Sequence, residues 1–407
     1  MIESNSFNGF DYVAIGLGLV FLWSTLVVAV GLLIPRRKHP VADRKLRFAV
    51  LICARNEENV IRLPVKSVLM SSYPKDKREV IVVADNCTDK TAEAARAAGA
   101  TVWEKTEPSS GKGDVLAWAI NKVLERSDYY DAIAVFDADN VVSAQWFDEM
   151  NNALNDGDVI ATGRRMTSNA TTNVISGWYT VYWDLMNELS NRVRTKLGLS
   201  GKLTGTGFAF LTTILEGKGW RTHTLVEDVE FSVQCNISGR RIGYISEAEY
   251  SDEQPVKVKH MWHQLCRWTT GGWHVAGLYL FPWLKAMFRR PSMRLFDSYF
   301  AILTGMSVAF VLLFAVLAFV IKVCLGGPAV QAAILCLAMF VFVAIVGLVT
   351  AWGAVFLSSK KRRPKWWAVL TFPAFSFILS ASILWTIVFP TRRWKPIPHG
   401  NSEPEEM

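Results

Sequence analysis

The fold class of this chain is decided by one stretch, AIAVFDADN, at residues 132–140. Its first five residues are apolar, which is typical of a strand covered on both faces of a sheet. Two aspartates, Asp137 and Asp139, follow where that strand ends. Ligands of sheets with helical crossovers bind beyond the carboxyl ends of the strands. The stretch therefore predicts a buried strand that leads into a polar site, with a solvated turn as the alternative.

Further apolar runs upstream alternate with segments of helical length. The expected strands cover residues 48–53, 80–84, 101–103 and 132–136, and the expected helices cover residues 57–69, 91–98 and 115–126. Gly99 follows the second of these helices, where a glycine often ends a helix. Alternation of strands and helices implies right-handed crossovers and a mainly parallel, Rossmann-like sheet. We therefore expect an α/β domain.

Carboxylates at the strand ends predict a metal site. Residues two apart on an extended segment face the same way, so Asp137 and Asp139 can point at one cation. Mg²⁺ and Mn²⁺ take carboxylate and phosphate oxygens as ligands. Asp85 ends the strand at residues 80–84 in the same manner.

A candidate anion site precedes the helix at residues 115–126. The sequence Gly111-Lys112-Gly113-Asp114 places a lysine at the start of that helix. A lysine and a helix N-terminus together can hold a diphosphate. The spacing of a Walker P-loop is absent, and a flexible loop is the alternative interpretation.

Two later motifs add candidate residues for binding and catalysis. Gly205 and Gly207 flank Thr206, and paired glycines permit the close approach of a ligand, although an ordinary turn has the same composition. Glu227 and Asp228 lie between apolar residues, where a carboxylate can act as a general base. Acidic residues are also common at helix N-termini for reasons unrelated to catalysis.

The motif QLCRW at residues 264–268 is the last candidate. Gln264, Arg267 and Trp268 share one face of a helix. Arginine grips anions with two parallel hydrogen bonds, and the tryptophan ring offers a flat surface to a sugar. An amphipathic helix at a membrane surface is the alternative. His260 and His263 are three residues apart and so match metal-ligand spacing, but a solvated pair is the simpler interpretation.

The composition indicates a membrane protein. Of 407 residues, 51% are hydrophobic and 20% are charged, with 16 tryptophans and a net charge of +8. Six scattered cysteines form no Cys-x-x-Cys pair, which argues against a zinc ribbon and fits a protein that faces the cytosol. The basic residues gather beside apolar runs, where they contact lipid headgroups, and no nucleic-acid-binding motif is present.

Residues 13–34 form an uncharged run that is long enough to cross the ~30 Å of a membrane interior. No basic residue precedes the run, so we expect an anchor rather than a cleaved signal peptide. Six basic residues follow it closely: Arg36, Arg37, Lys38, Arg44, Lys45 and Arg47. Because basic residues favour the cytosolic side, the N-terminus is expected outside and the next region in the cytosol.

Three further apolar runs cover residues 299–321, 330–357 and 366–389, and a basic loop (Lys360, Lys361, Arg362, Arg363 and Lys365) separates the last two. With that loop in the cytosol, the number of spans places the C-terminus outside. Arg392, Arg393 and Lys395 argue for the inside instead, and Pro373 permits a kinked or re-entrant segment. The side of the C-terminus stays open.

The expected organisation has four parts. They are an N-terminal transmembrane helix at residues 1–34, a cytosolic domain at 35–298 that ends in amphipathic interfacial helices, a membrane region of two to three spans at 299–389, and a short tail at 390–407. Aromatic stretches at residues 178–183 and 273–283 favour the membrane surface, and guidance of a sugar chain is an alternative role for them.

Taken in order, these motifs resemble the membrane-integrated family 2 glycosyltransferases, the group that includes cellulose, chitin and hyaluronan synthases. The resemblance runs from about residue 50 to residue 268. It rests on an Asp after the second strand, an Asp-x-Asp, a Thr-Glu-Asp-like triad and a Gln-x-x-Arg-Trp, and it implies the nucleotide-sugar-binding A-type glycosyltransferase fold. The chain departs from the pattern at Val226, where Thr is usual, and at Asn140, where some relatives have a histidine metal ligand.

The resemblance also implies a role for each candidate residue. Arg55, Asn56, Glu57 and Asp85 would bind uridine, and Lys112 would neutralise the diphosphate. Asp137 would contact the nucleotide and, with Asp139, a Mg²⁺ or Mn²⁺ ion. Gly205, Thr206, Gly207 and Glu227 would line the acceptor site, and Asp228 would be the base. Gln264, Arg267 and Trp268 would hold the donor diphosphate and the acceptor sugar.

The expected activity is the inverting transfer of glucose or N-acetylglucosamine from a UDP-sugar to the end of a growing β-linked polysaccharide, coupled to its secretion across the plasma (inner) membrane. An inverting transfer needs one base and no enzyme nucleophile, which the residues provide. The alternative is a non-processive enzyme that adds one or a few sugars to a membrane lipid. A non-enzymatic export subunit fits poorly because the motif set is complete. The sequence does not indicate the oligomeric state.

Overall fold

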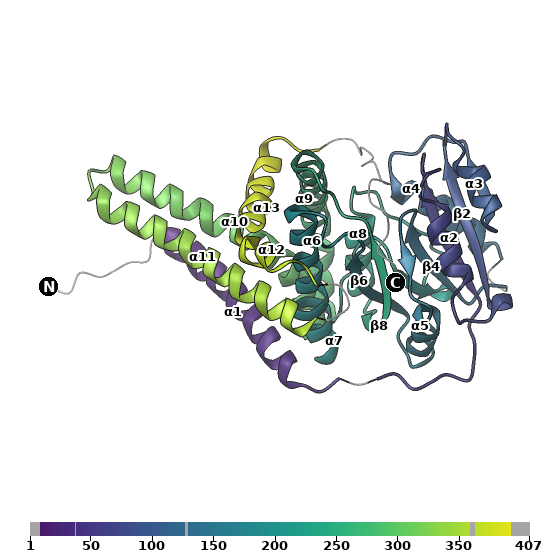
Figure 1. The fold of residues 1–407 in the computed structure, drawn as a ribbon. Coiled ribbons are helices and arrows are strands. Elements are labelled where there is room, and N and C mark those ends of the chain that lie inside the picture. Colours follow the sequence, from purple (N-terminus) through teal and green to yellow (C-terminus); the bar gives the residue numbers. More distant parts are fainter. Residues whose placement is uncertain (1–8, 37, 127–128, 359–362, 392–407) are drawn as a thin grey trace.

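The computed structural model describes residues 9–36, 38–126, 129–358 and 363–391. They form an α/β domain from which three long apolar helices project on one side (Figure 1). Several basic residues that bear on the expected topology lie outside the described residues: Arg37, Lys360, Lys361, Arg362, Arg392, Arg393 and Lys395.

An eight-stranded mixed sheet forms the centre of the domain, in the order β3-β2-β1-β4-β7-β6-β8-β5. The strands are β1 (Phe48–Ala54), β2 (Arg78–Asp85), β3 (Thr101–Lys105), β4 (Ala132–Asp137), β5 (Val141–Val142), β6 (Ile160–Thr167), β7 (Phe208–Leu211) and β8 (Ile242–Asp252). The first four strands are parallel, as their alternation with helices predicts. β7 is antiparallel to β4 and β6, and β8 is parallel to β6. The expected α/β class with a Rossmann-like mixed sheet is confirmed.

Helices cover both faces of this sheet. They are α2 (Arg62–Leu69), α3 (Thr91–Ala97), α4 (Lys112–Leu124), α5 (Trp146–Asn155) and α8 (Glu227–Ile237), with two short 3₁₀ turns at Lys75–Lys77 and Thr212–Ile214. Phe48, Val50 and Ile52 of β1 pack in the core that contains α2, α3 and α5. Ala49 and Leu51 pack in the opposite core with α4 and α8. Alternate side chains of one strand therefore enter two cores, which explains its unbroken apolar sequence.

The register of the parallel strands brings the start of several loops to one edge of the sheet. Ala54 at the end of β1 pairs with Ala84 of β2. Cys53 pairs with Asp137, the last residue of β4. The loops that follow these three strands therefore start at the same height along the sheet.

Two long helices lie between the sheet and the apolar helices (Figure 1). The first is α6 (Val174–Asp184), which continues through a π-helical stretch (Leu185–Arg192) into α7 (Val193–Lys196). The second is α9 (Val258–Arg289). Asn173 caps the start of α6, because its side chain accepts hydrogen bonds from Ile175 N and Ser176 N. The two helices place their side chains between the domain and the membrane-facing part of the chain.

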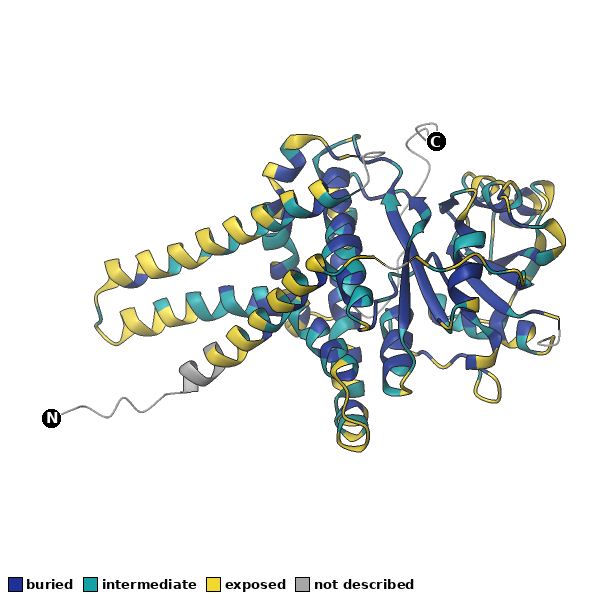
Figure 2. Cartoon of the chain, turned by 90° about the horizontal axis from the view of Figure 1, so that it is seen from below, coloured by how far each residue is buried: buried dark blue, intermediate teal, exposed yellow. Residues whose placement is uncertain are grey.

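Three helices are long and apolar enough to cross a membrane: α1 (Gly9–Leu33), α10 (Met293–Cys324) and α11 (Ala329–Leu357). Their projecting parts carry mostly exposed apolar side chains (Figure 2). α10 begins before the expected boundary at residue 299 and so includes Asp297. The helix accommodates this buried carboxylate because the carboxylate oxygens accept hydrogen bonds from Trp23 Nε1 and Arg194 Nε.

The last apolar run is divided into α12 (Trp366–Leu370) and α13 (Phe372–Val388). α13 has 17 residues. At ~1.5 Å per residue it is shorter than the ~30 Å interior of a bilayer. It packs against α9, where Thr386 Oγ1 donates a hydrogen bond to Thr269 Oγ1, and its Phe375 ring contacts Tyr179 and Tyr182 of α6. α13 therefore packs over α6 and α9.

Candidate active site

The predicted uridine residues gather where β1 and β2 end. Arg55 Nη2 lies 2.5 Å from a carboxylate oxygen of Asp85, which is buried. Ser109 Oγ donates to the same carboxylate and accepts a hydrogen bond from Arg55 Nη2. Asn56 has a positive φ of 58°, and its side chain accepts a hydrogen bond from Thr88 N. Ser109 is a site residue that sequence analysis missed, because it lies in an irregular loop and belongs to no motif.

This cluster also explains why the helix expected at residues 57–69 starts later, at Arg62. Glu57 N donates to Thr91 Oγ1, and Glu58 N donates to Asp89. These bonds fix the backbone of residues 57 and 58 against the loop that follows β2. Residues 57 and 58 therefore belong to the candidate site and not to the helix.

Lys112 connects three parts of the chain. It opens α4, three residues before the expected start of that helix at residue 115. Its Nζ lies 2.5 Å from Asp137 Oδ1, 2.6 Å from the Gly205 carbonyl oxygen and 3.8 Å from Glu227 Oε1. Burial lowers the pKa of Lys112, but the carboxylates of Asp137 and Glu227 outweigh this and raise its pKa overall. The lysine is therefore a fixed cation beside two carboxylates.

The Asp137-Ala138-Asp139 motif forms a turn and not the extended segment that we expected. The Asn140 backbone N donates to the Asp137 carbonyl, which closes the turn. The buried side chain of Asn140 also stabilises the turn. Its Oδ1 accepts a hydrogen bond from Asp137 N, and its Nδ2 donates a hydrogen bond to Asp139 Oδ1. Thr206 Oγ1 also accepts from Asp137 N. Asn140, noted in the sequence only as a missing metal ligand, therefore shapes the motif.

The donor set at this turn fits a metal that is shared with a substrate. In the part of the chain that the structure describes, no three His, Cys, Asp or Glu side chains gather closely enough to hold a metal on their own. Mg²⁺ is commonly bound by one or two carboxylates together with substrate phosphates and water. Asp137 and Asp139 match that pattern, whereas His260 and His263 join no such group.

The loop at residues 204–207 is tied to the same turn. Gly207 has a φ of 63°, and a Cβ there would overlap the Tyr250 ring. Tyr250 OH donates to the Thr206 carbonyl oxygen at 2.9 Å. Gly205 offers its carbonyl to Lys112. Gly207 thus permits close packing of the loop on β8.

Glu227 and Asp228 occupy the first turn of α8 and are both buried. Burial raises the pKa of each carboxyl group, and for both the charge of Lys112 acts in the opposite direction. Arg267 also lowers the pKa of Asp228. A carboxylate held in this way is suited to accept a proton from a bound hydroxyl group.

The QLCRW motif on α9 faces both α8 and α6. Arg267 Nη1 donates to the Leu225 carbonyl oxygen, in the segment before Asp228. Gln264 Oε1 is buried without a hydrogen-bond partner. The Trp268 ring stacks on Tyr182 with centroids 6.0 Å apart. One face of Trp268 is therefore covered by protein.

The aromatic residues of α6 are buried and not exposed to a membrane surface as we expected. Tyr179 and Trp183 are buried, and both contact Trp268 edge-on. Their spacing along the helix places them on one face with Tyr182. This spacing was visible in the sequence, but the partner helix α9 was not.

An ion pair between Arg165 and Asp252 supports this region. Arg165 Nε lies 3.2 and 3.1 Å from the two carboxylate oxygens of Asp252. Its Nη1 donates to the Thr204 carbonyl oxygen, and its guanidinium group lies over the Trp183 ring. These two residues belong to no motif, so sequence analysis could not single them out.

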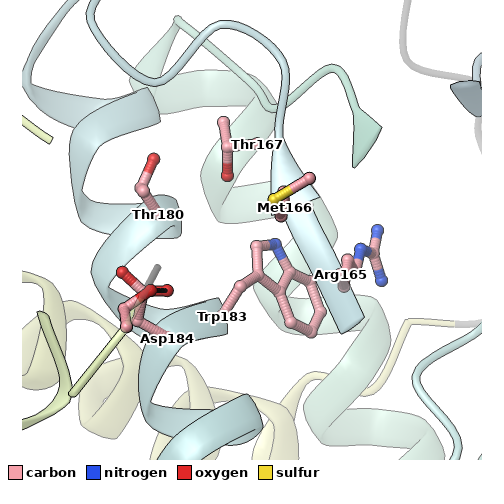
Figure 3. A pocket seen from close by; sticks show the side chains of 7 residues that line it. Arg165, Met166, Thr167, Thr180, Trp183 and Asp184 are labelled. Atoms are coloured by element: carbon pink, nitrogen blue, oxygen red, sulfur yellow. Dashed lines mark hydrogen bonds between the residues drawn. The ribbon is translucent and has the colours of Figure 1, made fainter. Parts of the chain in front are cut away.

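Beside this pair lies a cavity of about 10 Å³, which has room for a single water molecule. Figure 3 shows its lining, to which β6, α6 and the end of α11 contribute Arg165, Met166, Thr167, Thr180, Trp183, Asp184 and Ser358. Trp183 Nε1 and Thr167 Oγ1 are buried there without hydrogen-bond partners. Burial raises the pKa of Asp184 to about 7. The cavity is too small for a sugar. It lies among the side chains that support the candidate site.

Residues 46–271, more than half of the chain, match the family described as glycosyltransferase-like family 2. The chain belongs to this family. The solved mannosyltransferase PcManGT from Pyrobaculum calidifontis, in complex with GDP-Man and Mn²⁺, superposes with a TM-score of 0.57 at 18% identity and covers 92% of this chain and 99% of its own. This likeness shows the A-type glycosyltransferase fold.

Two curated relatives match this family 2 glycosyltransferase over its catalytic domain. The probable glycosyltransferase YdaM of Bacillus subtilis is 28% identical over 62% of this chain and 62% of its own length. A β-monoglucosyldiacylglycerol synthase of Nostoc is 28% identical over 63% of this chain and 56% of its own. The aligned region thus spans less than two thirds of each relative. The family that the motif set predicted, the family 2 glycosyltransferases, is confirmed.

Proposed function

We propose that this enzyme transfers a sugar from a UDP-sugar to a hydroxyl group presented at the membrane side of the domain, with inversion at the anomeric carbon. The observation that carries the proposal is the burial of Asp228 beside the charges of Lys112 and Arg267. Asp228 takes the proton of the acceptor hydroxyl, whose oxygen forms a bond to the anomeric carbon. The bond from that carbon to the diphosphate breaks, and UDP leaves with the electron pair. Lys112 and Arg267 stabilise the charge that develops on UDP.

The donor side is assigned from the strand ends. Arg55, Asn56, Glu57 and Asp85 would hold the uridine, and Gln264 would help to hold the diphosphate. Asp137 and Asp139 would hold Mg²⁺ or Mn²⁺ together with diphosphate oxygens, and the ion would supply further positive charge to the leaving group. The glucosyl transfer named for the Nostoc relative favours UDP-glucose over UDP-N-acetylglucosamine.

We favour a membrane lipid as the acceptor. α6 and α9, which carry Tyr182 and Trp268, lie against the apolar helices (Figure 1). Among the described residues only α1, α10 and α11 are both long and apolar enough to span a bilayer. A lipid hydroxyl can reach Glu227, Asp228 and the 205–207 loop from the cytosolic leaflet without a channel for a polymer. The relative named for diacylglycerol also supports a lipid acceptor.

Extension of a β-linked polysaccharide is the second candidate. It is favoured by the Gln264, Arg267 and Trp268 motif, which resembles that of processive synthases. In both cases the domain at residues 35–298 would face the cytosol beneath the plasma membrane, with the N-terminus outside. The region at 299–389 would then hold two spans and the shorter α13.

The test is UDP release by the full chain in lipid nanodiscs that contain diacylglycerol. UDP-glucose and UDP-N-acetylglucosamine are supplied in turn with Mn²⁺ or Mg²⁺, and the product is separated into organic extract and polymer. We expect a discrete glycolipid in the organic phase and a rate for Asp228→Asn that is lower by ~10²–10⁴-fold. A long polymer that glycosidase degrades would establish the second candidate instead. Undiminished activity of Asp228→Asn would move the base to another residue.

A further inference from the structure

Glu230 is a buried carboxylate that the proposed chemistry does not use. It lies on α8 and has no exposed surface. Its Oε2 accepts hydrogen bonds from His223 N and Thr224 N, each at 2.8 Å. Its Oε1 accepts a hydrogen bond from Tyr279 OH at 2.9 Å. Buried polar groups of this kind are costly unless they are satisfied, so three donors on one carboxylate indicate a defined structural task.

Glu230 holds the segment that leads into the first turn of α8. Thr222 packs on the start of α4, where a Cβ at Gly113 would lie 3.1 Å from Thr222 Oγ1. Leu225 accepts the hydrogen bond from Arg267. Residues 222–225 therefore touch both the helix of Lys112 and the arginine of α9. A shift of this segment would move Asp228 relative to both cations.

No side chain of the described residues caps the start of α8. Its N-cap residue is Val226, which forms no side-chain hydrogen bond to the helix start. Val226 instead packs on the backbone of α9, because a Cβ at Gly271 would lie 2.6 Å from Val226 Cγ2. Glu230 accepts hydrogen bonds from two backbone N–H groups that precede the helix, and so it ties the segment at 223–224 to α8.

Tyr279 extends the contact from α8 to α9. Its hydroxyl group donates to Glu230 and accepts from Gln234 Nε2 at 2.7 Å. Gln234 Nε2 also donates to the Arg221 carbonyl oxygen. Tyr279 lies on the same helix as Arg267 and Trp268. The segment at 221–224, the base helix and the QLCRW helix are thus joined through one set of hydrogen bonds.

We propose that Glu230, with Tyr279, is a positioning residue that fixes Asp228 on α8 relative to Arg267 on α9. The inference rests on the proposed role of Asp228 as the base. Glu230 holds the segment before Asp228, and Tyr279 holds Glu230 to α9. The pair sets the distance between the group that accepts the proton and the group that receives the leaving diphosphate.

The first test removes only the link to α9. Tyr279→Phe deletes one hydroxyl group and should lower kcat about tenfold with an unchanged KM for UDP-glucose, because small misplacements of reacting groups are expensive. Tyr130→Phe is the matched control, since its hydroxyl group also donates to a carboxylate, that of Glu79, on the far side of the domain. It should lose the same thermal stability and keep kcat. Equal kcat losses in the two variants, or a wild-type kcat in Tyr279→Phe, would overturn the proposal.

The second test is independent of catalysis. Glu230→Ala should speed the hydrogen exchange of the amides of His223 and Thr224, measured on a peptide that covers residues 221–226, and should also lower kcat. Glu230→Gln keeps an oxygen for these amides and can donate its amide hydrogens to Tyr279, so it should restore slow exchange and most of kcat. Unchanged exchange in Glu230→Ala would overturn the inference. Absence of UDP release by the wild-type chain would count against the proposed function alone, and the exchange result would still stand.

Discussion

The ammonium group of Lys112 lies 2.5 Å from a carboxylate oxygen of Asp137. This contact joins the first turn of α4 to the last residue of β4, and the Gly205 carbonyl completes the grip on the lysine. The cation is thus held by the carboxylate that is expected to share a metal with the donor. The site carries its positive charge in place before the diphosphate binds, which is the condition for electrostatic stabilisation of a leaving group.

Replacement of this lysine should strongly reduce the rate. We expect Lys112→Met to lower kcat by ~10²–10³-fold, because the developing charge on UDP loses a fixed cation. UDP release with UDP-glucose measures the effect. Lys122→Met is the control, since Lys122 lies on the same helix, is exposed and stacks on Trp118. Similar losses in both variants would indicate damage to α4 and not to the diphosphate site.

The pH dependence of the reaction should report the acidic pair on α8. Burial raises the pKa of Glu227 and of Asp228. Because a base must be deprotonated, kcat/KM should rise with pH through an apparent pKa that belongs to the pair and lies well above the ~4 of a free carboxyl group. Lys112→Met should shift this rise to higher pH, since the lysine lowers both pKa values. A rise centred near pH 4 in the wild-type enzyme would contradict this expectation.

The same pair also predicts how the stability of the folded protein changes with pH. This effect runs opposite to the effect of pH on kcat/KM. A folded state that raises the pKa of a carboxyl group disfavours its ionised form, so the free energy of unfolding should fall as the pH rises from ~4 through the raised pKa. Asp228→Asn cannot ionise and should lose less stability over this range than the wild-type protein does. Thermal unfolding at pH 5 and pH 8 measures the difference. Equal losses in both proteins would remove Asp228 from the explanation.

The fold was predictable where one strand contributes side chains to two hydrophobic cores. The apolar runs at residues 48–53, 80–84 and 132–136 predict parallel strands, because only a strand covered on both faces has no polar alternation. β7 and β8 were not predicted, since their partners in the sheet are distant in the sequence and their patterns are weaker. The sequence does not reveal that α10 extends upstream of the apolar run at residue 299, because the hydrogen bonds of Asp297 with Trp23 and Arg194 come from distant parts of the chain.

The candidate site was predictable as a set of motifs and not as a set of contacts. The sequence placed Asp85 and Asp137 at the ends of two strands and Lys112 at the start of a helix, and the structure brings Lys112 against Asp137. It could not indicate that Asn140 shapes the turn of the aspartates or that Tyr182 covers one face of Trp268. Such contacts depend on how helices pack, which local sequence patterns do not specify.

Gly207 provides a prediction that follows from packing alone. Its positive φ and the overlap of a Cβ with the Tyr250 ring mean that Gly207→Ala must displace the loop or the ring. We expect a lower melting temperature and a loss of most transferase activity, because the loop also carries Thr206 and Gly205 to Asp137 and Lys112. Gly353→Ala, where a Cβ meets no atom within 4 Å, is the control. Full activity of Gly207→Ala would show that the loop does not have to hold this conformation.

The ion pair of Arg165 and Asp252 should contribute to folding far more than surface pairs do. Both side chains are buried, and Arg165 also bonds the Thr204 carbonyl and stacks on Trp183. Asp252→Ala leaves a buried guanidinium group without its partner, and we expect the free energy of unfolding to fall by about 3–5 kcal/mol. Glu104→Gln removes the carboxylate from the exposed pair with Arg96 and should cost less than ~1 kcal/mol. Chemical unfolding of the three proteins in one detergent measures the difference. If Asp252→Ala is no less stable than Glu104→Gln, the buried Arg165 side chain does not depend on Asp252, and the pair does not contribute to folding as expected.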